Sequence, residues 1–253
     1  MTVKELYSHF ERTIPVSLRE AWDNDGVMCC SDGSREVLRT LVALDVTEEI
    51  VDYAISANFN LIVSHHPLIF KPIGSLNEEN HISRKLIKLI ESDVAVFSFH
   101  TRADKVEGGV NDRLADTLDI FDTRPFGEGG LGRIGNIDEV MSLDDFAYRV
   151  KQALASDVLK YSDGYNPVKT VAVVGGDGKD YLSAAIAEGA DTFVSGRISY
   201  NMMEEAAELG INLIEAGHYF TEQPVTDYFS KLLLEFDPDM YVEVASSNLI
   251  KYI

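Results

Sequence analysis

The sequence has few cysteines and no long apolar run, and each shortage excludes a class of protein. The two cysteines, Cys29 and Cys30, are adjacent and cannot build a disulfide framework. We expect them to be small, partly buried thiols in the reducing cytoplasm. No run approaches the ~18 consecutive apolar residues of a membrane helix. The amino terminus mixes charges into an amphipathic pattern, unlike a signal peptide. A cytoplasmic protein without a membrane partner is therefore expected.

Positive charge is also scarce. The chain has 22 lysines and arginines against 42 aspartates and glutamates, which gives a formal net charge of −20. A general nucleic-acid binder needs cationic side chains against phosphates, so general nucleic-acid binding is not expected. The acids are spread along the chain without a dense tail, which indicates a solvated surface that favours nearby cations.

Helix and strand patterns alternate along the whole chain. Apolar runs predict strands over 37–46, 59–64 and 94–99 in the first half, and over 170–174, 191–195 and 211–215 in the second. Amphipathic segments between them predict helices. This alternation is typical of an α/β fold with mostly parallel sheets.

The two halves resemble each other in sequence. AISANFNLIVSHH (54–66) aligns without gaps with AIAEGADTFVSGR (185–197). The third strand of each half ends in a histidine with an acid four residues later, as His100 with Asp104 and His218 with Glu222. The repetition predicts two similar three-layer α/β/α domains related by internal duplication. We place them at residues 1–124 and 125–253, with the alternative that the last elements pack back on the first domain.

Four of the six histidines fall at predicted strand ends: His65, His66, His100 and His218. A single histidine at such a place is more often a hydrogen-bonded structural residue than a ligand. Together with Asp104 and Glu222, however, these histidines could supply the ligands of a metal site, provided that the strand ends converge. Imidazoles and carboxylates bind zinc, iron, manganese, cobalt and nickel, and the pattern does not distinguish these metals.

Six candidate ligands are too many for one catalytic ion, which usually takes three from the protein. They suit two divalent ions with a bridging carboxylate such as Glu222, and such a pair activates a water and clamps substrate oxygens. Asp45, at the end of the first strand, is either an orienting group for a ligand or a helix-entry acid.

Two further features carry less chemistry. Gly175-Gly176-Asp177-Gly178 follows a strand but lacks the phosphate-binding patterns, so an ordinary βα turn is favoured over a phosphate cradle. Ser64 and Ser195 lie at strand ends without the G-x-S-x-G elbow, which argues against a serine hydrolase.

Four motifs resemble, in the same order, those of the Ngg-interacting-factor-3-like family. They are WDNDG (22–26), SHHPLIF (64–70), HTRAD (100–104) and GHYFTE (217–222). Many family members carry the name GTP cyclohydrolase 1 type 2 homologue. The resemblance extends from about residue 3 to about residue 250. It implies two similar α/β domains, a dinuclear metal centre in the cleft between them, and a homohexamer built as a trimer of dimers.

The resemblance also implies roles for individual residues. Matching the motifs gives the metal ligands His65, His66, Asp104, His218 and Glu222. His100 is implied as a near-site or catalytic residue, and Glu222 as a catalytic one as well as a ligand. The chain departs from the family where Arg197 and Asn201 replace an acid and an imidazole.

The function implied by the resemblance is that of a metal-dependent hydrolase acting on a nucleotide or another phosphorylated small molecule. Its specific form is the opening of the GTP ring with release of formate, in which activated water attacks C8 and His100 shuttles a proton. One alternative is a phosphoesterase with a different substrate. Another is a non-enzymatic metal-binding scaffold or metal-insertion protein.

Overall fold

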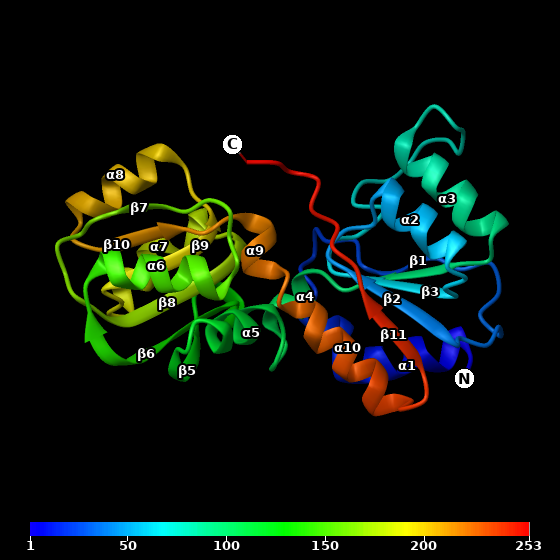
Figure 1. Cartoon of the computed structure of the whole chain (residues 1–253), viewed down its shortest axis with the longest axis horizontal. Coiled ribbons are helices and arrows are strands. Elements are labelled where there is room, and N and C mark those ends of the chain that lie inside the picture. Colours follow the sequence, from blue (N-terminus) through cyan, green and yellow to red (C-terminus); the bar gives the residue numbers. More distant parts are fainter. Residues whose placement is uncertain (253) are drawn as a thin grey trace. The chain divides into compact units, whose positions relative to one another are not determined.

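The chain forms two compact units, each built around one β-sheet (Figure 1). A computed structural model describes residues 1–252. The first unit comprises residues 1–106 and 225–249, and the second comprises residues 107–224 with the terminal segment from Ile250. Among the described residues, no helix is both long enough and apolar enough to cross a membrane.

The sheet of the first unit has the strand order β1-β4-β3-β2-β11. The strands are β1 (Gly26–Cys29), β2 (Arg39–Ala43), β3 (Leu61–Ser64), β4 (Ala95–Ser98) and β11 (Tyr241–Val244). β11, β2, β3 and β4 run parallel, and β1 pairs antiparallel with β4. β2, β3 and β4 are almost entirely buried, as expected for parallel strands that helices cover on both faces.

Helices cover both faces of this sheet (Figure 1). The helices are α1 (Val3–Thr13), α2 (Glu48–Ser56), α3 (His81–Glu91), α4 (Thr101–Lys105) and α10 (Val225–Phe236), with a 3-10 helix η1 (Val16–Leu18). α2 and α3 pack in one apolar cluster with Leu41 and Ile62. On the other face, Phe10 of α1 stacks on Phe99 with ring centroids 4.7 Å apart, and Phe229 of α10 lies 6.1 Å from the same ring. The first unit is therefore a three-layer α/β/α sandwich.

The sheet of the second unit has the order β5-β6-β8-β9-β10-β7. Its strands are β5 (Phe121–Phe126), β6 (Gly132–Met141), β7 (Lys160–Ser162), β8 (Val168–Asp177), β9 (Thr192–Arg197) and β10 (Asn212–Glu215). β8, β9 and β10 are parallel, and the remaining strands pair antiparallel.

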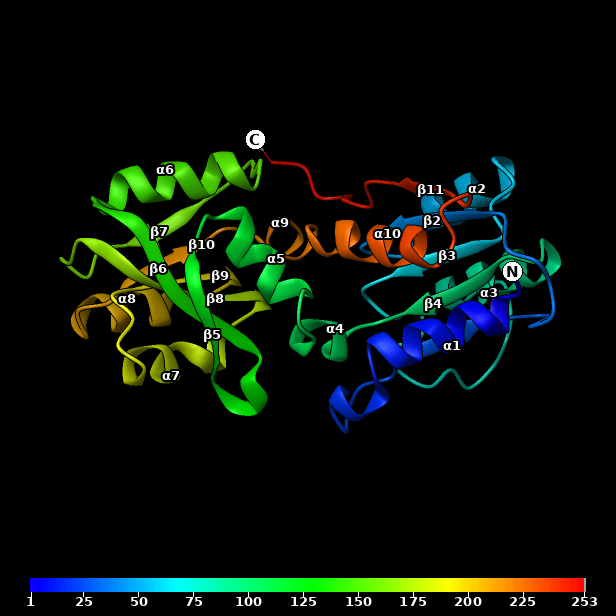
Figure 2. The same ribbon diagram turned by 90° about the horizontal axis from the view of Figure 1, so that it is seen from below.

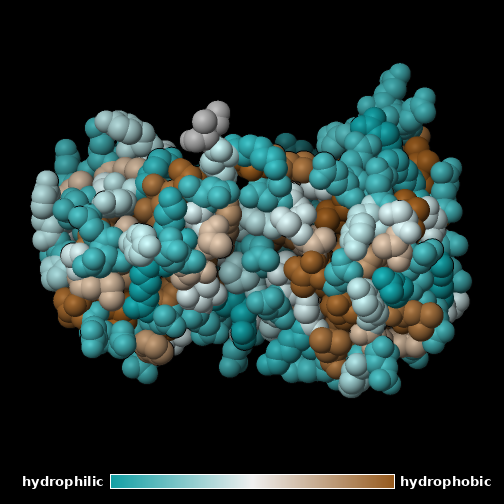
Figure 3. Space-filling model, in the orientation of Figure 1, coloured by the Kyte–Doolittle hydropathy of each residue, from teal (hydrophilic) through white to brown (hydrophobic). Residues whose placement is uncertain are grey.

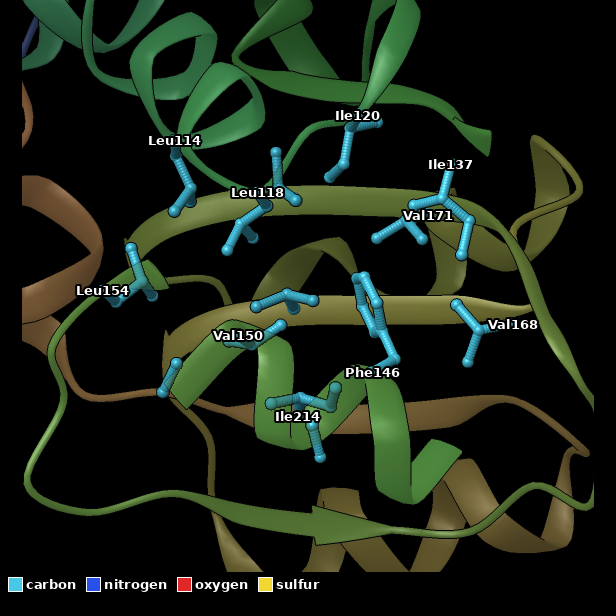
Figure 4. Close-up of a cluster of buried hydrophobic side chains, with 14 of the residues drawn as sticks. Leu114, Leu118, Ile120, Ile137, Phe146, Val150, Leu154, Val168, Val171 and Ile214 are labelled. Carbon is cyan, nitrogen blue, oxygen red and sulfur yellow. The ribbon is translucent and has the colours of Figure 1, made fainter. Parts of the chain in front are cut away.

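Successive side chains of β8 point to opposite faces of the sheet and pack into two separate apolar cores. Val171 and Val173 pack with α5 (Val110–Thr117), α6 (Leu143–Ala153) and α9 (His218–Glu222), and Figure 4 shows part of this cluster around Phe146. Ala172 and Val174 pack on the opposite face with α7 (Leu182–Ala187) and α8 (Tyr200–Glu208). Two 3-10 helices, η2 (Glu128–Gly130) and η3 (Lys179–Tyr181), complete the unit. The two-residue period of a strand thus produces the second three-layer sandwich.

The topology confirms the predicted duplicated α/β fold. The three central parallel strands follow the order β4-β3-β2 in the first unit and β10-β9-β8 in the second. Outside them, β1 and β7 each precede these strands in the chain and pair antiparallel with the third one. A five-residue helix, α4 or α9, follows the third strand in each unit.

One boundary of the compact units differs from the predicted division after residue 124. The second unit begins at Glu107, because Leu114 and Leu118 near α5 belong to its core. The segment Val225–Leu249 belongs to the first unit, as in the alternative that the last elements pack back on the first domain, and β11 extends the sheet beside β2 (Figure 2). Arg124 and Pro125, between which the division was placed, are both paired within the β5–β6 hairpin.

The surface agrees with the acidic composition. On the face shown in Figure 3, hydrophilic residues cover most of each unit, and hydrophobic residues form separate patches. With a net charge of −20, this is the surface of a strongly hydrated protein.

Candidate metal centre

Three histidines converge at one edge of the first sheet. His65 and His66 directly follow β3, and His100 follows β4 after one residue. β3 and β4 are neighbouring parallel strands in register, with Ser64 opposite Ser98, so their carboxyl ends lie side by side. Each ring offers a nitrogen, and these three nitrogens lie within 4.8 Å of one another. The convergence on which the metal interpretation depends is present within this unit.

The Nδ1 atom of each of these three rings lies within hydrogen-bond distance of an oxygen that can only accept. The partners are Phe99 O at 3.0 Å from His65, Asp45 Oδ1 at 2.7 Å from His66, and Asp23 Oδ1 at 2.8 Å from His100. Each Nδ1 must therefore carry a hydrogen, which leaves Nε2 as the nitrogen that can bind a metal whenever the ring is neutral. Metal-binding histidines characteristically have one ring nitrogen held in this way.

Asp45 orients a ligand candidate. Its carboxylate holds His66, whereas the amino-terminal cap of α2 is Thr47, whose side chain accepts a hydrogen bond from the Ile50 amide. The Ser247 hydroxyl lies 3.3 Å from the other Asp45 oxygen and connects it to the segment after β11. Of the two interpretations of Asp45, the structure favours the orienting group.

Asp104 is the acid of the first unit that approaches the histidines. It lies in the first turn of α4, and its Oδ1 is 3.6 Å from His65 Nε2. Its side chain is 14% exposed, so a carboxylate and an imidazole face each other at a mostly buried position. The predicted ligands His65, His66 and Asp104 thus lie around one place in this unit.

Asp23 was missed as a functional residue, because WDNDG predicts only a turn when it is read locally. Its Oδ1 holds His100, and its Oδ2 accepts hydrogen bonds from the Thr101 amide at 3.0 Å and the Thr101 hydroxyl at 2.7 Å. Burial acts to raise the pKa of Asp23. The hydrogen bond and charge of His100, with the Thr101 hydrogen bonds, outweigh burial and lower the pKa to about 2.

The same pair shifts the pKa of His100 in the opposite direction. Burial alone lowers the pKa of this imidazole, but the Asp23 hydrogen bond and the charges of Asp104 and Asp23 outweigh it and raise the pKa. The raised pKa favours the protonated form of His100, which suits a group that donates a proton.

Arg102, which is fully buried, fixes the loop that carries Asp23. Its Nε lies 3.0 Å from Asp25 Oδ2, and its Nη1 lies 2.6 Å from Glu11 Oε1 and 2.9 Å from the Ile14 carbonyl. A buried guanidinium needs such partners to offset its lost hydration. The WDNDG loop is thereby tied to α1 and α4.

The second unit carries its candidate ligands on α9. His218 and Glu222 are one helical turn apart, and their Nε2 and Oε2 atoms are 2.9 Å apart. Glu222 is only 5% exposed. The helix begins directly after Gly217, whose φ of +90° is costly for other residues.

Two glycines make room for these side chains. A Cβ on Gly176 would lie 2.1 Å from Glu222 Oε1 and 3.2 Å from His218 Nε2, and a Cβ on Gly196 would lie 2.4 Å from Thr221 Oγ1. Gly176 also has a φ of +65°. β8 continues through Gly175 and Gly176 to Asp177, which pairs with Arg197 after a bulge. The stretch expected to be a simple βα turn is therefore mostly strand, and its glycines accommodate α9.

Arg197, Asn201 and the strand-end serines are not among the candidate ligands. Arg197 and Asn201, which depart from the family pattern, are both exposed, at the end of β9 and in α8. The Ser64 and Ser98 hydroxyls are fully buried and 2.8 Å apart, as structural partners in the first sheet. Ser195 is also fully buried and donates to the Gly176 carbonyl. These environments agree with the argument against a serine nucleophile.

Comparison with known proteins places the chain in a family. The model of the family described as Duf34/NIF3 (NGG1p interacting factor 3) matches residues 1–252. A Clostridium perfringens protein named GTP cyclohydrolase 1 type 2 homolog is 33% identical over 263 residues, covering 100% of both chains. A Helicobacter pylori protein named GTP cyclohydrolase 1 type 2 is 32% identical over 93% of both chains.

Solved structures agree with this placement. The crystal structure of a Staphylococcus aureus hypothetical protein has a TM-score of 0.90 and 28% identity, and the match covers 100% of this chain and 99% of that one. Reduced HcgD from Methanocaldococcus jannaschii has a TM-score of 0.83 and 27% identity, and the match covers 98% of both chains. The chain belongs to the DUF34/NIF3 family.

Proposed function

We propose that this protein is a metal-dependent hydrolase with GTP cyclohydrolase 1 type 2-like activity on a nucleotide or another phosphorylated small molecule. One observation carries the metal dependence: three imidazoles with ring nitrogens within 4.8 Å of one another, each held through Nδ1. The names of the relatives support the substrate class.

The proposed ligands are His65, His66 and Asp104 of the first unit and His218 and Glu222 of the second. Within each unit the donors fit a divalent ion, because an imidazole and a carboxylate face each other. His65, Asp104 and Glu222 are mostly buried, and the His218 side chain is 42% exposed. We propose two ions per chain, from among zinc, iron, manganese, cobalt and nickel. The support for assigning both ligand sets to one dinuclear centre is the family resemblance.

Bound divalent ions would supply Lewis-acid chemistry, by lowering the pKa of water and stabilising developing negative charge. The chain's own contribution is proton transfer and positioning. Asp23 orients His100 through Nδ1, so the Nε2 of the protonated ring is the atom that would donate a proton to a leaving nitrogen. The Glu222 carboxylate lies against His218 in space that the missing Cβ of Gly176 leaves open.

Metal content tests the ligand assignment directly. The protein, stripped of metal and dialysed against each of the five metals in turn, should retain about two equivalents of its preferred ion. His66→Ala and Glu222→Ala should retain less, whereas His81→Ala, an exposed histidine at the start of α3, should match the wild type. Equal retention by all four proteins would contradict the assignment.

Formate release from GTP tests the activity. The metal-loaded wild type should release formate, and Glu222→Ala should not. A wild type as inert as Glu222→Ala in every metal would reject the cyclohydrolase activity. Release of inorganic phosphate from a nucleotide panel would then indicate a phosphoesterase, and tight metal binding without any turnover would indicate a scaffold or metal-insertion protein.

We further propose a cytoplasmic homohexamer, a trimer of dimers as the resemblance implies. Cys29 and Cys30 are free thiols, which agrees with a reducing compartment. Burial, with the neighbouring Cys30, raises the pKa of Cys29 to about 11, so this thiol stays protonated and unreactive. Light scattering should give about six times the chain mass of 28.1 kDa. A mass of one or two chains would reject the hexamer.

A further inference from the structure

Two large aromatic side chains lie exposed beside His100. Trp22 is 63% exposed and Phe70 is 46% exposed. The ring centroid of Trp22 is 6.2 Å from those of both Phe70 and His100, and Phe70 lies 6.0 Å from His100. All three pairs are edge-to-face. Trp22 and Phe70 are therefore in contact with each other and with the imidazole assigned to proton transfer.

The exposure of these rings does not result from a loose loop. Asp23 and Asp25, which follow Trp22, are 8% and 7% exposed and are held by Thr101 and Arg102. The chain thus buries the acids on either side of Asn24 while the indole stays in solvent. An indole that stays in solvent does not contribute the large stabilisation that its burial would give. Its exposure therefore suggests a role in binding.

Phe70 is held in a similar way. Leu68, two residues earlier, is 4% exposed and belongs to the apolar core of the first unit. The Asn24 side-chain amide donates to the carbonyl of Ile69, and this bond joins the loop of Trp22 to the loop of Phe70. The two rings are thus presented from anchored, mutually bonded loops, and a ligand would find them already positioned.

We propose that Trp22 and Phe70 form a binding subsite for a planar aromatic ring of nucleobase size, which they hold beside His100. Exposed aromatic faces bind planar rings by stacking, and each stacked base gains substantially in affinity. Ligand sites typically combine apolar or aromatic walls with a few placed polar groups, which His100 and its neighbours supply here. The subsite rests on the proposed function and deepens it, because it selects substrates by their ring rather than by their phosphates.

Binding is measurable without turnover, because Trp22 is the only tryptophan of the chain. Its fluorescence should be quenched by guanosine and by GTP, and left unchanged by ribose 5-phosphate, which has no aromatic ring. N-acetyltryptophanamide titrated in parallel corrects for light absorbed by the nucleosides. Calorimetry with guanosine then gives dissociation constants for the wild type and for variants that lack the tryptophan.

Trp22→Leu and Phe70→Leu should each weaken guanosine binding by about 5- to 150-fold. Trp22→Phe should retain most of the affinity. Tyr148→Leu, which removes an exposed aromatic ring from α6, should bind guanosine like the wild type. Circular dichroism and light scattering verify that each variant keeps its fold and its oligomeric state.

Several outcomes would overturn the subsite. They are unchanged guanosine affinity in both leucine variants, equal quenching by ribose 5-phosphate, no guanosine binding at all, or a changed oligomeric state in the variants, which would make the rings an interface. If GTP is turned over but both leucine variants bind guanosine normally, the subsite fails and the proposed function stands. If the leucine variants lose guanosine binding while no formate is released from GTP, the subsite stands and the cyclohydrolase activity fails.

Discussion

Asp23 and Asp45 show how single carboxylates prepare imidazoles for metal or proton chemistry. Each accepts a hydrogen bond from the Nδ1 of one histidine, at 2.8 Å for His100 and 2.7 Å for His66. A ring held in this way keeps one tautomer and one orientation. At the residue scale, the candidate centre therefore depends on acids that are not themselves among the proposed ligands.

Asp23→Asn should reduce stability in a pH-dependent manner in the metal-free protein. The pKa of Asp23 is about 2 when folded, below its value of about 3.9 in an unfolded chain, so the carboxylate stabilises the fold above about pH 4. That stabilisation, about 2 kcal/mol, is lost as the pH falls towards 2.

Urea unfolding of the wild type and Asp23→Asn between about pH 7 and pH 3 measures this difference. The gap in unfolding free energy should narrow as the pH falls. Asp180→Asn, at an exposed position, serves as the control and should show no such gap. A gap that is constant with pH would contradict the assigned role of the Asp23 charge.

Gly176→Ala should disturb the candidate ligands of the second unit. The added methyl group would lie 2.1 Å from Glu222 Oε1, so the carboxylate has to move. We expect metal affinity to fall about 10- to 100-fold, as for loss of a group that orients a ligand.

Gly189→Ala is the matched control for this change. Gly189 also has a positive φ, +85°, but a Cβ there would meet nothing within 4 Å. Both variants carry backbone strain of about 1–2 kcal/mol, whereas only Gly176→Ala should lose metal in an equilibrium titration. Equal metal affinity in the two variants would show that Glu222 does not need the space.

At the scale of elements, α10 and β11 join the first unit although they come after the second in the chain. β11 pairs in register with β2, from Tyr241 opposite Arg39 to Val244 opposite Val42. α10 covers the face of the same sheet that α1 covers, with Phe229 among the rings of Phe10 and Phe99. The core of the first unit is therefore complete only after residues 225–249 have been synthesised.

Phe229→Ala should destabilise the first unit by about 3–5 kcal/mol, because it leaves a cavity at a fully buried position. Hydrogen exchange should accelerate most in β2, β3 and β4. Phe146→Ala on α6 makes the equivalent change in the second unit, where β8, β9 and β10 should respond most. Acceleration of the same amides by both variants would contradict this assignment of cores.

At the scale of the whole molecule, metal binding should be coupled to folding. The proposed ligands come from residues 65 to 222, so an unfolded chain cannot present them together. A divalent ion at a free concentration of 100 times its dissociation constant should therefore stabilise the protein by about 2.7 kcal/mol.

Thermal unfolding with and without the preferred metal measures this coupling. His66→Ala should lose most of the metal-induced rise in melting temperature, while His81→Ala should keep it. A rise of equal size in both variants would place the bound metal away from His66.

The sequence by itself determined the parts of the structure that depend on local pattern. Apolar runs predicted the six central strands, because parallel strands buried on both faces need continuous hydrophobic residues. β1, β5, β6 and β7 were missed, because this signal is absent there. Five of the six residues of β5 are exposed, and residues 127–135 beside it are rich in glycine.

The candidate ligands were visible for a similar reason. His65, His66, His100 and His218 lie within a few residues of the ends of apolar runs, and acids follow His100 and His218 at helical spacing, so chain order alone marks them. Only the tertiary structure decided which residues orient them. Asp23 lies 77 residues from His100 in the chain, and Gly176 lies 46 residues from Glu222. Strand order and register bring these pairs together, and no local preference of the chain encodes which distant side chain will meet an imidazole or a carboxylate.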